Sequence, residues 1–297
     1  YCSGLDNPII ITIDGSGEYE ATVFWDENLN KLRSISNENS LGRFYYSGVQ
    51  FLGYDYIHDS GKVMGLAPYG EYRAEFEEKF DEIAPFGGGE YSVQDCTIAK
   101  LEELFGPSLK SPRDFSQREK DFAYHLQRRT EKIVCDLVQN FIGEQDNSEV
   151  CLAGGLAMNC KMNREVATLA AVDELFVQPA ANDSGICLGA AIEAYRLTAD
   201  KEPDLELDHL YWGPEYDNNK IHQKLCDCQI KFEQPDDIAE KAAKLLARGD
   251  TVGWFQGRME FGPRALGHRS ILANPQSTES RDRVNRIKSR EQWRPFA

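Results

Sequence analysis

The chain has 297 residues, of which 41% are apolar and 28% charged, ordinary proportions for a globular protein. Its length favours two domains over one. A net charge of −16 argues against non-specific binding to nucleic acid or to an anionic membrane. No stretch approaches the roughly 20 apolar residues of a membrane-spanning helix. The eight cysteines are scattered without a Cys-x-x-Cys pair, so we expect reduced thiols and a cytoplasmic location.

A strand hairpin is predicted near the start of the chain. The β-branched run of residues 9–14 meets a glycine-rich turn, and residues 18–25 alternate loosely. Such a hairpin can lay backbone N–H groups against a phosphate chain, while its acids order a metal ion or its waters. The same residues also make ordinary turns. As candidate nucleotide-binding residues we take Asp14, Gly15, Gly17 and Glu18.

Apolar residues at helical spacing predict helices over residues 41–54 and, at greater length, over residues 117–143. Residues 58–70, which lie between them, are rich in glycine and polar side chains, and we predict a loop there. This loop carries His58 and Lys62. Lys62 is a candidate nucleotide-binding residue; the alternative is an ordinary surface loop.

Two strand–loop–helix units follow, the pattern of an α/β domain. In the first, the strand at residues 150–153 leads through Gly154 and Gly155 into a helix that carries Asn159. The two glycines allow either a nucleotide or a neighbouring element to approach the backbone, and Asn159 faces either the ligand or solvent. All three are candidate nucleotide-binding residues. In the second, Asp183 precedes the small-residue helix at residues 186–197. From sequence alone, Asp183 is either a helix N-cap or a metal ligand.

Composition changes over residues 199–216, an acidic segment with two prolines and a glycine. We place a domain boundary there and assign residues 1–200 and 201–297 to separate domains. In the second domain, Asp237 caps a predicted helix that ends near Arg248. A strand at residues 251–255 then leads into a basic segment.

The basic segment, Gly257–Ala297, contains eight arginines and one lysine against four acids, a balance of +5, whereas the rest of the chain has 24 bases against 45 acids. Guanidinium groups match phosphate or carboxylate oxygens in pairs, so we predict a cationic pocket for a small anion. Glycine and proline shape the loop that holds Arg258, Arg264 and Arg269, and His268 can bind a phosphate oxygen. The alternative is a solvated basic face.

Several blocks of sequence are similar to the O-carbamoyltransferase family of nodulation proteins and antibiotic-modifying enzymes. They occur in family order over nearly the whole chain, and the Glu-Phe-Gly-Pro-Arg-Ala-Leu-Gly run is highly specific. The blocks are residues 60–70, 154–159, 176–179, 183–185, 257–267, 288–291 and 293–296.

The resemblance implies an α/β architecture with an actin-like ATPase half-module followed by part of a YrdC-like domain. It implies that carbamoyl phosphate and ATP form a carbamoyl-adenylate, from which a hydroxyl of a small-molecule or sugar acceptor is carbamoylated in the presence of iron, magnesium or another divalent metal. Asp183 matches the family's metal-ligand aspartate, which outweighs the capping interpretation. A homodimer is one expected assembly. By resemblance, Arg264 and Lys288 carry the carbamoyl phosphate chemistry, with these residues nearby: Arg258, His268, Arg269, Arg290 and Arg294.

The chain also departs from the family. The metal-binding histidines of the family lie upstream of a segment like residues 1–4, and the first strand unit lies further back. We therefore expect a fragment that is inactive alone. An actin-like sugar or acid kinase is the main alternative, with an RNA-binding module and a non-catalytic remnant as further ones. Net charge argues against nucleic acid as a partner.

Overall fold

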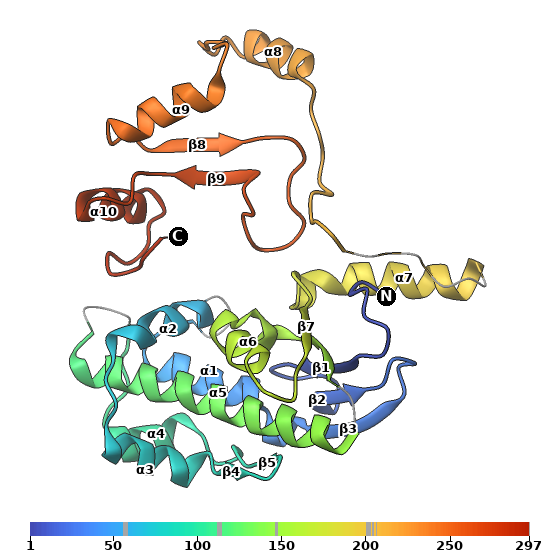
Figure 1. Cartoon of the computed structure of the whole chain (residues 1–297). Helices are drawn as coiled ribbons and strands as arrows, with labels where there is room; N and C mark the ends of the chain where they lie inside the picture. Colours follow the sequence, from blue (N-terminus) through green and yellow to red (C-terminus); the bar gives the residue numbers. More distant parts are fainter. Residues whose placement is uncertain are drawn as a thin grey trace. The chain divides into compact units, whose positions relative to one another are not determined.

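The computed structural model describes residues 1–55, 59–111, 115–145, 148–199, 203, 205 and 207–296 (Figure 1). The chain divides into two compact units, Tyr1–Leu207 (unit 1) and Asp208–Ala297 (unit 2), and the division falls inside the acidic segment 199–216. His58 lies outside the described residues. Among the described helices, none is both long enough and apolar enough to cross a membrane.

Unit 1 is built on a five-stranded mixed sheet with the order β3-β2-β1-β6-β7. β1 pairs antiparallel with β2 and parallel with β6, and β6 pairs parallel with β7. The carboxyl ends of β1, β6 and β7 therefore share one edge of the sheet. The predicted α/β class is confirmed in this coarse sense. The strands are β1 (Ile9–Ile13), β2 (Glu20–Trp25), β3 (Lys31–Ser36), β6 (Glu149–Ala153) and β7 (Glu174–Val177).

A long helix, α5 (Gln117–Gln145), forms the centre of the unit 1 core and confirms the predicted helix (Figure 1). Its Phe122 packs on Phe51 at a ring distance of 4.4 Å, and its Phe141 packs on Phe24 of β2 at 4.2 Å. The sheet and the helical layer thus share one apolar core. The other helices and strands up to β6 are α1 (Leu41–Phe51), α2 (Ser60–Leu66), α3 (Ala74–Ile83), β4 (Phe86–Gly87), β5 (Glu90–Tyr91) and α4 (Ile98–Phe105).

The predicted loop over residues 58–70 is wrong from Ser60 onward. The structure has α2 there, followed by a 3₁₀ turn, Ala67–Tyr69. Val63 and Leu66 are fully buried and lie one helical turn apart, so packing against the core outweighs the low helix propensity of the glycines. The two strand–loop–helix units are confirmed, with a 3₁₀ turn (Gly155–Met158), α6 (Cys160–Ala167), a second 3₁₀ turn (Asp183–Gly185) and α7 (Ile186–Ala199).

In the described residues of unit 2, β8 (Val252–Phe255) pairs antiparallel with β9 (Arg269–Leu272), and three helices accompany them. The predicted capping of α9 is confirmed, because the Asp237 carboxylate accepts the Glu240 N–H at 2.8 Å. Phe255 pairs with Arg269, which places Arg269 at the first position of β9 rather than in a loop. The elements are α8 (Asn218–Asp227), α9 (Ile238–Ala247), β8 (Val252–Phe255), β9 (Arg269–Leu272) and α10 (Thr278–Ile287).

A buried histidine joins α3 to α5. His125 Nε2 accepts the backbone N–H of Arg73 at 2.8 Å, and Nδ1 lies 3.2 Å from Glu77 Oε2. Nε2 is an acceptor, so the proton of the neutral ring is on Nδ1 and is donated to Glu77. Burial lowers the pKa of His125 below its ordinary value, although the neighbouring Glu77 carboxylate opposes this shift.

This shift predicts a loss of stability on mild acidification. The unfolded chain takes up a proton near pH 6.5 whereas the folded ring does so only at lower pH, so the free energy of unfolding should fall as pH drops below about 6.5. Hydrogen exchange at α5 amides between pH 8 and pH 5, corrected for intrinsic exchange, measures this. We expect His125→Asn to weaken the pH dependence and the exposed His222→Asn to leave it intact. An identical pH slope in all three proteins would contradict the assignment.

Candidate functional site

The first candidate site is a pocket of about 340 Å³ at the carboxyl-terminal edge of the unit 1 sheet. The crevice outside the carboxyl ends of parallel strands is the usual ligand site of open α/β sheets. Three predicted site residues line it from three loops: Asp14 after β1, Gly154 after β6 and Asp183 before α7. Its apolar wall includes Ile186, Leu188 and Ile192 of α7.

The turn after β1 is held by its own hydrogen bonds. Asp14 Oδ1 accepts the Gly15 N–H at 2.8 Å, and the Gly15 carbonyl accepts the Ser40 hydroxyl at 2.8 Å. The Gly17 N–H donates to Glu20 O and Asn37 Oδ1, both at 3.1 Å. Both predicted glycine amides are thus bonded within the chain. Glu18 is exposed.

The two glycines after β6 permit close packing against this turn. Gly154 has φ of 92°, and a Cβ there would lie 2.3 Å from the Ile13 carbonyl oxygen. A Cβ on Gly155 would lie 3.0 Å from Asp14 Oδ1. The neighbour that approaches these glycines is therefore the end of β1, and their small size brings Asp14 beside the β6 loop.

Gly154→Ala should destabilise unit 1 strongly. A left-handed conformation costs a non-glycine residue about 1–2 kcal/mol, and displacement of the Ile13 backbone adds to it, so we expect a loss of roughly 2 kcal/mol or more. Hydrogen exchange at β6 amides measures the change. The control is Gly143→Ala in α5, where no described atom outside the adjacent residues and the helix's own backbone lies within 4 Å of the new Cβ. Equal protection in the two variants would contradict the packing argument.

Asn159 and Lys62 are engaged inside unit 1. The Asn159 side chain is buried, caps α6 by accepting the Met162 N–H at 3.1 Å, and exchanges two 3.0 Å hydrogen bonds with Gln127. Lys62 Nζ lies 2.8 Å from Asp59 Oδ1 and over the Tyr54 ring. Neither Asn159 nor Lys62 is among the described residues that line the 340 Å³ pocket.

Asp183 is exposed and opens the 3₁₀ turn before α7. A metal ion in a protein needs several ligands. In the described part of the chain, no group of three His, Cys, Asp or Glu side chains is arranged to hold one. The described residues therefore do not fit a complete metal site, and Asp183 supplies one carboxylate to the pocket that Asp14 also lines.

The second candidate site lies in unit 2, where the loop between β8 and β9 folds around a buried acid. Glu260 Oε1 accepts backbone N–H groups from Leu266 at 2.8 Å, His268 at 2.9 Å and Arg269 at 3.1 Å. Burial by itself would raise the pKa of Glu260, but the backbone N–H donors outweigh it and lower the pKa to about 2. Glu260 was not among the residues predicted from the sequence, although it is one of only four acids in the basic segment.

Arg258 and His268 are parts of the same loop's framework. Arg258 Nε donates to Gly213 O at 3.0 Å, and its carbonyl accepts from His268 Nδ1 at 2.8 Å. The His268 ring stacks on Tyr211 with centroids 3.6 Å apart and planes within 4°. Both predicted ligands thus fasten the loop to residues 211–213.

A second buried polar residue holds the segment after α10. Asn285 is fully buried; its Nδ2 donates to Gln292 O at 3.0 Å and Arg294 O at 2.8 Å, and its Oδ1 accepts from Arg290 Nε at 2.5 Å. These bonds fold the chain back on α10, and Lys288 is the C-cap of that helix. Partial burial, and then the charges of Arg290 and Arg294, lower the pKa of Lys288 below its ordinary value.

A pocket of about 560 Å³ in unit 2 is lined by basic residues from two separate parts of the chain. Arg269 lines it from β9, Lys288 from the end of α10, and Trp254 and Phe255 from β8. Arg264 is exposed; Pro263 and Ala265 on either side of it line the pocket, whereas Arg264 is outside the set of described lining residues. Arg258, His268, Arg290 and Arg294 are likewise outside it, so the structure places Arg269 and Lys288 at the cavity itself.

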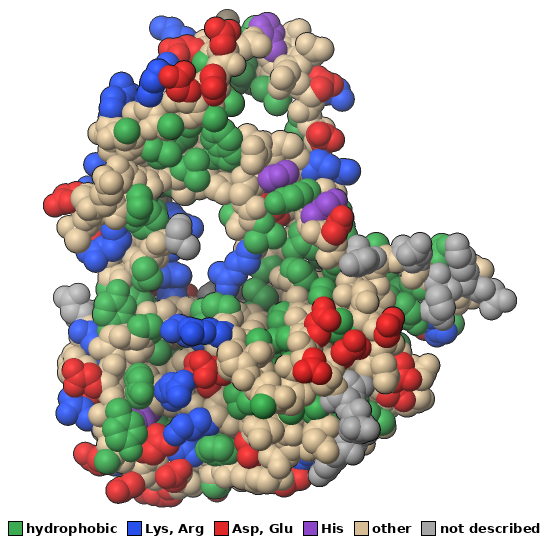
Figure 2. Space-filling view, in the orientation of Figure 1, with side chains coloured by type: hydrophobic (Ala, Val, Ile, Leu, Met, Phe, Trp, Pro, Cys, Tyr) green, Lys and Arg blue, Asp and Glu red, His purple; other side chains and the backbone are tan. Residues whose placement is uncertain are grey.

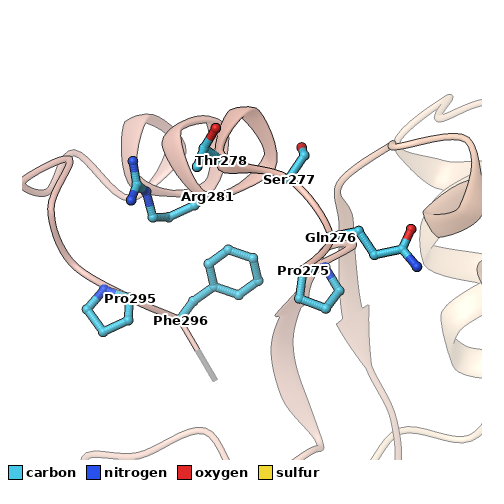
Figure 3. A pocket seen from close by; sticks show the side chains of 7 residues that line it. All are labelled: Pro275, Gln276, Ser277, Thr278, Arg281, Pro295 and Phe296. Carbon is cyan, nitrogen blue, oxygen red and sulfur yellow. The ribbon is translucent and has the colours of Figure 1, made fainter.

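Another hollow of about 300 Å³ in unit 2 lies between α10 and the end of the chain (Figure 3). Phe296 points into it, and Arg281 borders it. Arg281 Nη2 lies 2.8 Å from Asp282 Oδ1, which offsets its charge. On the face of the molecule shown in Figure 2, acidic and basic side chains are interspersed. The 560 Å³ pocket, with two cations facing one cavity, is the better anion site.

Comparison with protein families matches residues 3–192 to the carbamoyltransferase N-terminus and residues 243–297 to the carbamoyltransferase C-terminus. The chain is 37% identical over 305 residues to nodulation protein NolO of Bradyrhizobium diazoefficiens, which covers 99% of this chain and 55% of that protein. It is 32% identical over 250 residues to the 3'-hydroxymethylcephem-O-carbamoyltransferase of Streptomyces clavuligerus, which covers 81% of this chain and 44% of that enzyme. The chain spans about half the length of such relatives.

Proposed function

This chain belongs to the carbamoyltransferase family, and from this premise we propose that it serves O-carbamoylation of a hydroxyl on a small-molecule or sugar acceptor. Carbamoyl phosphate is the proposed carbamoyl donor. Its reaction with water releases inorganic phosphate and leaves carbamate. A carbamate oxygen then attacks the α-phosphorus of ATP and displaces pyrophosphate, which gives the carbamoyl-adenylate, and transfer of the carbamoyl group to the acceptor hydroxyl releases AMP and a proton. The names of the nodulation and cephem relatives support the reaction class.

The observation that carries the proposal is the pairing of Arg269 and Lys288 at one cavity of unit 2. Carbamoyl phosphate is a compact dianion, and a guanidinium together with an ammonium group complements its phosphoryl oxygens. The aromatic side chains of Trp254 and Phe255 border the same cavity and offer an apolar surface beside the charges. The kinase alternative leaves this pocket without a role.

In unit 1, the pocket beside Asp14 and Gly154 is the proposed site for the nucleotide part of the adenylate. Its place at the carboxyl ends of three parallel strands supports this role. The strand order of the sheet supports the actin-like assignment of unit 1, and the basic pocket supports the YrdC-like assignment of unit 2. Both finer fold assignments are part of the proposal.

The side chains divide into two kinds of role. Arg269 and Lys288 would contact the phosphoryl group. Arg264 lies between the lining residues Pro263 and Ala265, and its guanidinium would add a third positive charge near the bound anion. Arg258 and His268 hold the loop, and Arg290 and Arg294 raise the positive potential around Lys288. A divalent metal in unit 1 stays part of the proposal, but we derive no step through it because Asp183 and Asp14 do not complete a site.

Carbamoyl phosphate binding tests the proposal directly. We expect isothermal titration calorimetry to detect one site, and Lys288→Ala to weaken binding about tenfold or more, because a charge-assisted hydrogen bond contributes roughly 1.5–3 kcal/mol. The exposed Lys231→Ala is the matched control and should bind as the unaltered protein does. The proposal fails if the unaltered protein does not bind carbamoyl phosphate, or if Lys288→Ala binds it equally well.

A further inference from the structure

Glu260 is an acid enclosed by the most basic part of the chain. Its carboxyl group is 0% exposed, whereas Arg269, the nearest cation, is 42% exposed. Oε1 accepts three backbone N–H groups, but Oε2 has no hydrogen-bond partner among the described residues. The closest cation to Oε2 is Arg269 Nε at 3.8 Å, an ion pair that is longer than a hydrogen bond.

Burial of a carboxylate is unfavourable unless hydrogen bonds and charges compensate it. Here the compensation comes from the loop itself, whose N–H groups converge on Oε1 as they would on a bound anion. Gly262 and Gly267 make this possible, because both have positive φ, 94° and 101°. The loop is therefore already folded around an anion that belongs to the chain.

Arg269 is held by Glu260 at two points. Its backbone N–H donates to Oε1 at 3.1 Å, and its guanidinium lies beside Oε2. Arg269 also lines the 560 Å³ pocket, as Lys288 does. Glu260 is outside the described lining of that pocket and its side chain has no exposed surface, so it acts on a ligand indirectly, through Arg269 and the loop that it holds.

We propose that Glu260 is a positioning residue for anion capture in unit 2. Oε1 fixes the backbone of residues 266–269, and Oε2 directs the Arg269 guanidinium toward the pocket shared with Lys288. The identity of the anion as carbamoyl phosphate rests on the proposed function. The pre-formed loop itself does not.

A double-mutant cycle tests the proposal. Glu260→Gln keeps the shape of the side chain and removes its charge, and we expect the dissociation constant of carbamoyl phosphate, and of inorganic phosphate as a second probe, to rise about tenfold. Glu233→Gln, an exposed acid of the same unit, is the matched control and should change neither. In an Arg269→Gln background, Glu260→Gln should add less than twofold, because the two residues act as a unit.

Additive effects of the two substitutions would show that Glu260 does not act through Arg269, and an unchanged dissociation constant in Glu260→Gln would show that it does not act at all. Glu260→Asp keeps the charge but is one methylene shorter, and it replaces Glu260→Gln if the latter fails to fold. We expect it to weaken binding as well, and binding equal to that of the unaltered protein would overturn the proposal.

The proposal can also be separated from failure of the proposed function. If the unaltered protein binds neither probe, the proposed function fails. Hydrogen exchange then tests independently whether Glu260 holds the loop in place. Amides of Leu266, His268 and Arg269 should exchange at least tenfold faster in Glu260→Gln, while those of α10 keep their rates. Unchanged exchange at the three amides would overturn the positioning role.

Discussion

The candidate anion site exists because buried polar side chains hold two positively charged segments close together against the repulsion between their like charges. Arg269 reaches the unit 2 pocket from β9, and Lys288 reaches it from the end of α10, so two basic segments must lie side by side. Glu260 fixes the first with three hydrogen bonds to backbone N–H groups, and Asn285 fixes the second with two to carbonyl groups and one from Arg290. Because these bonds lie within the protein, the arrangement exists before a ligand arrives, which limits the ordering that binding must bring about.

The candidate site of unit 1 is formed in a different way, by the close approach of two backbone segments. Gly154 lets the β6 loop meet the end of β1, and the parallel strands carry Asp14 and Asp183 to the same edge of the sheet. Here side-chain size, rather than charge, decides the geometry. The pocket combines two carboxylates with an apolar wall from α7, whereas the unit 2 pocket combines two cations with aromatic side chains.

Elements with a clear period were predictable. The hairpin after Ile9, the long helix α5 and the two strand–loop–helix units follow from alternation and helical spacing over many residues. Helix α2 was not, because Val63 and Leu66 are its only buried residues in a glycine-rich segment, and their contribution to stability depends on the core against which they pack. Propensity is a weak guide where tertiary packing decides.

The candidate sites were predictable as loops but not as side-chain roles. Asp14, Gly154 and Asp183 meet as strand order requires, yet Asn159 turns inward to cap a helix. No local sequence pattern indicated the role of Glu260. The backbone N–H groups that donate to it lie six to nine residues further along the chain and reach its carboxylate only in the folded loop. Arg258 shows the same limit, because the Gly213 carbonyl that it binds precedes it by 45 residues.

A crystal structure of the protein with carbamoyl phosphate tests whether Arg269 and Lys288 form one pre-formed anion site. We expect phosphoryl density within hydrogen-bond distance of both residues, with the loop around Glu260 unchanged from the free protein. Density at another place, or a loop in which Glu260 has left its backbone donors, would contradict it.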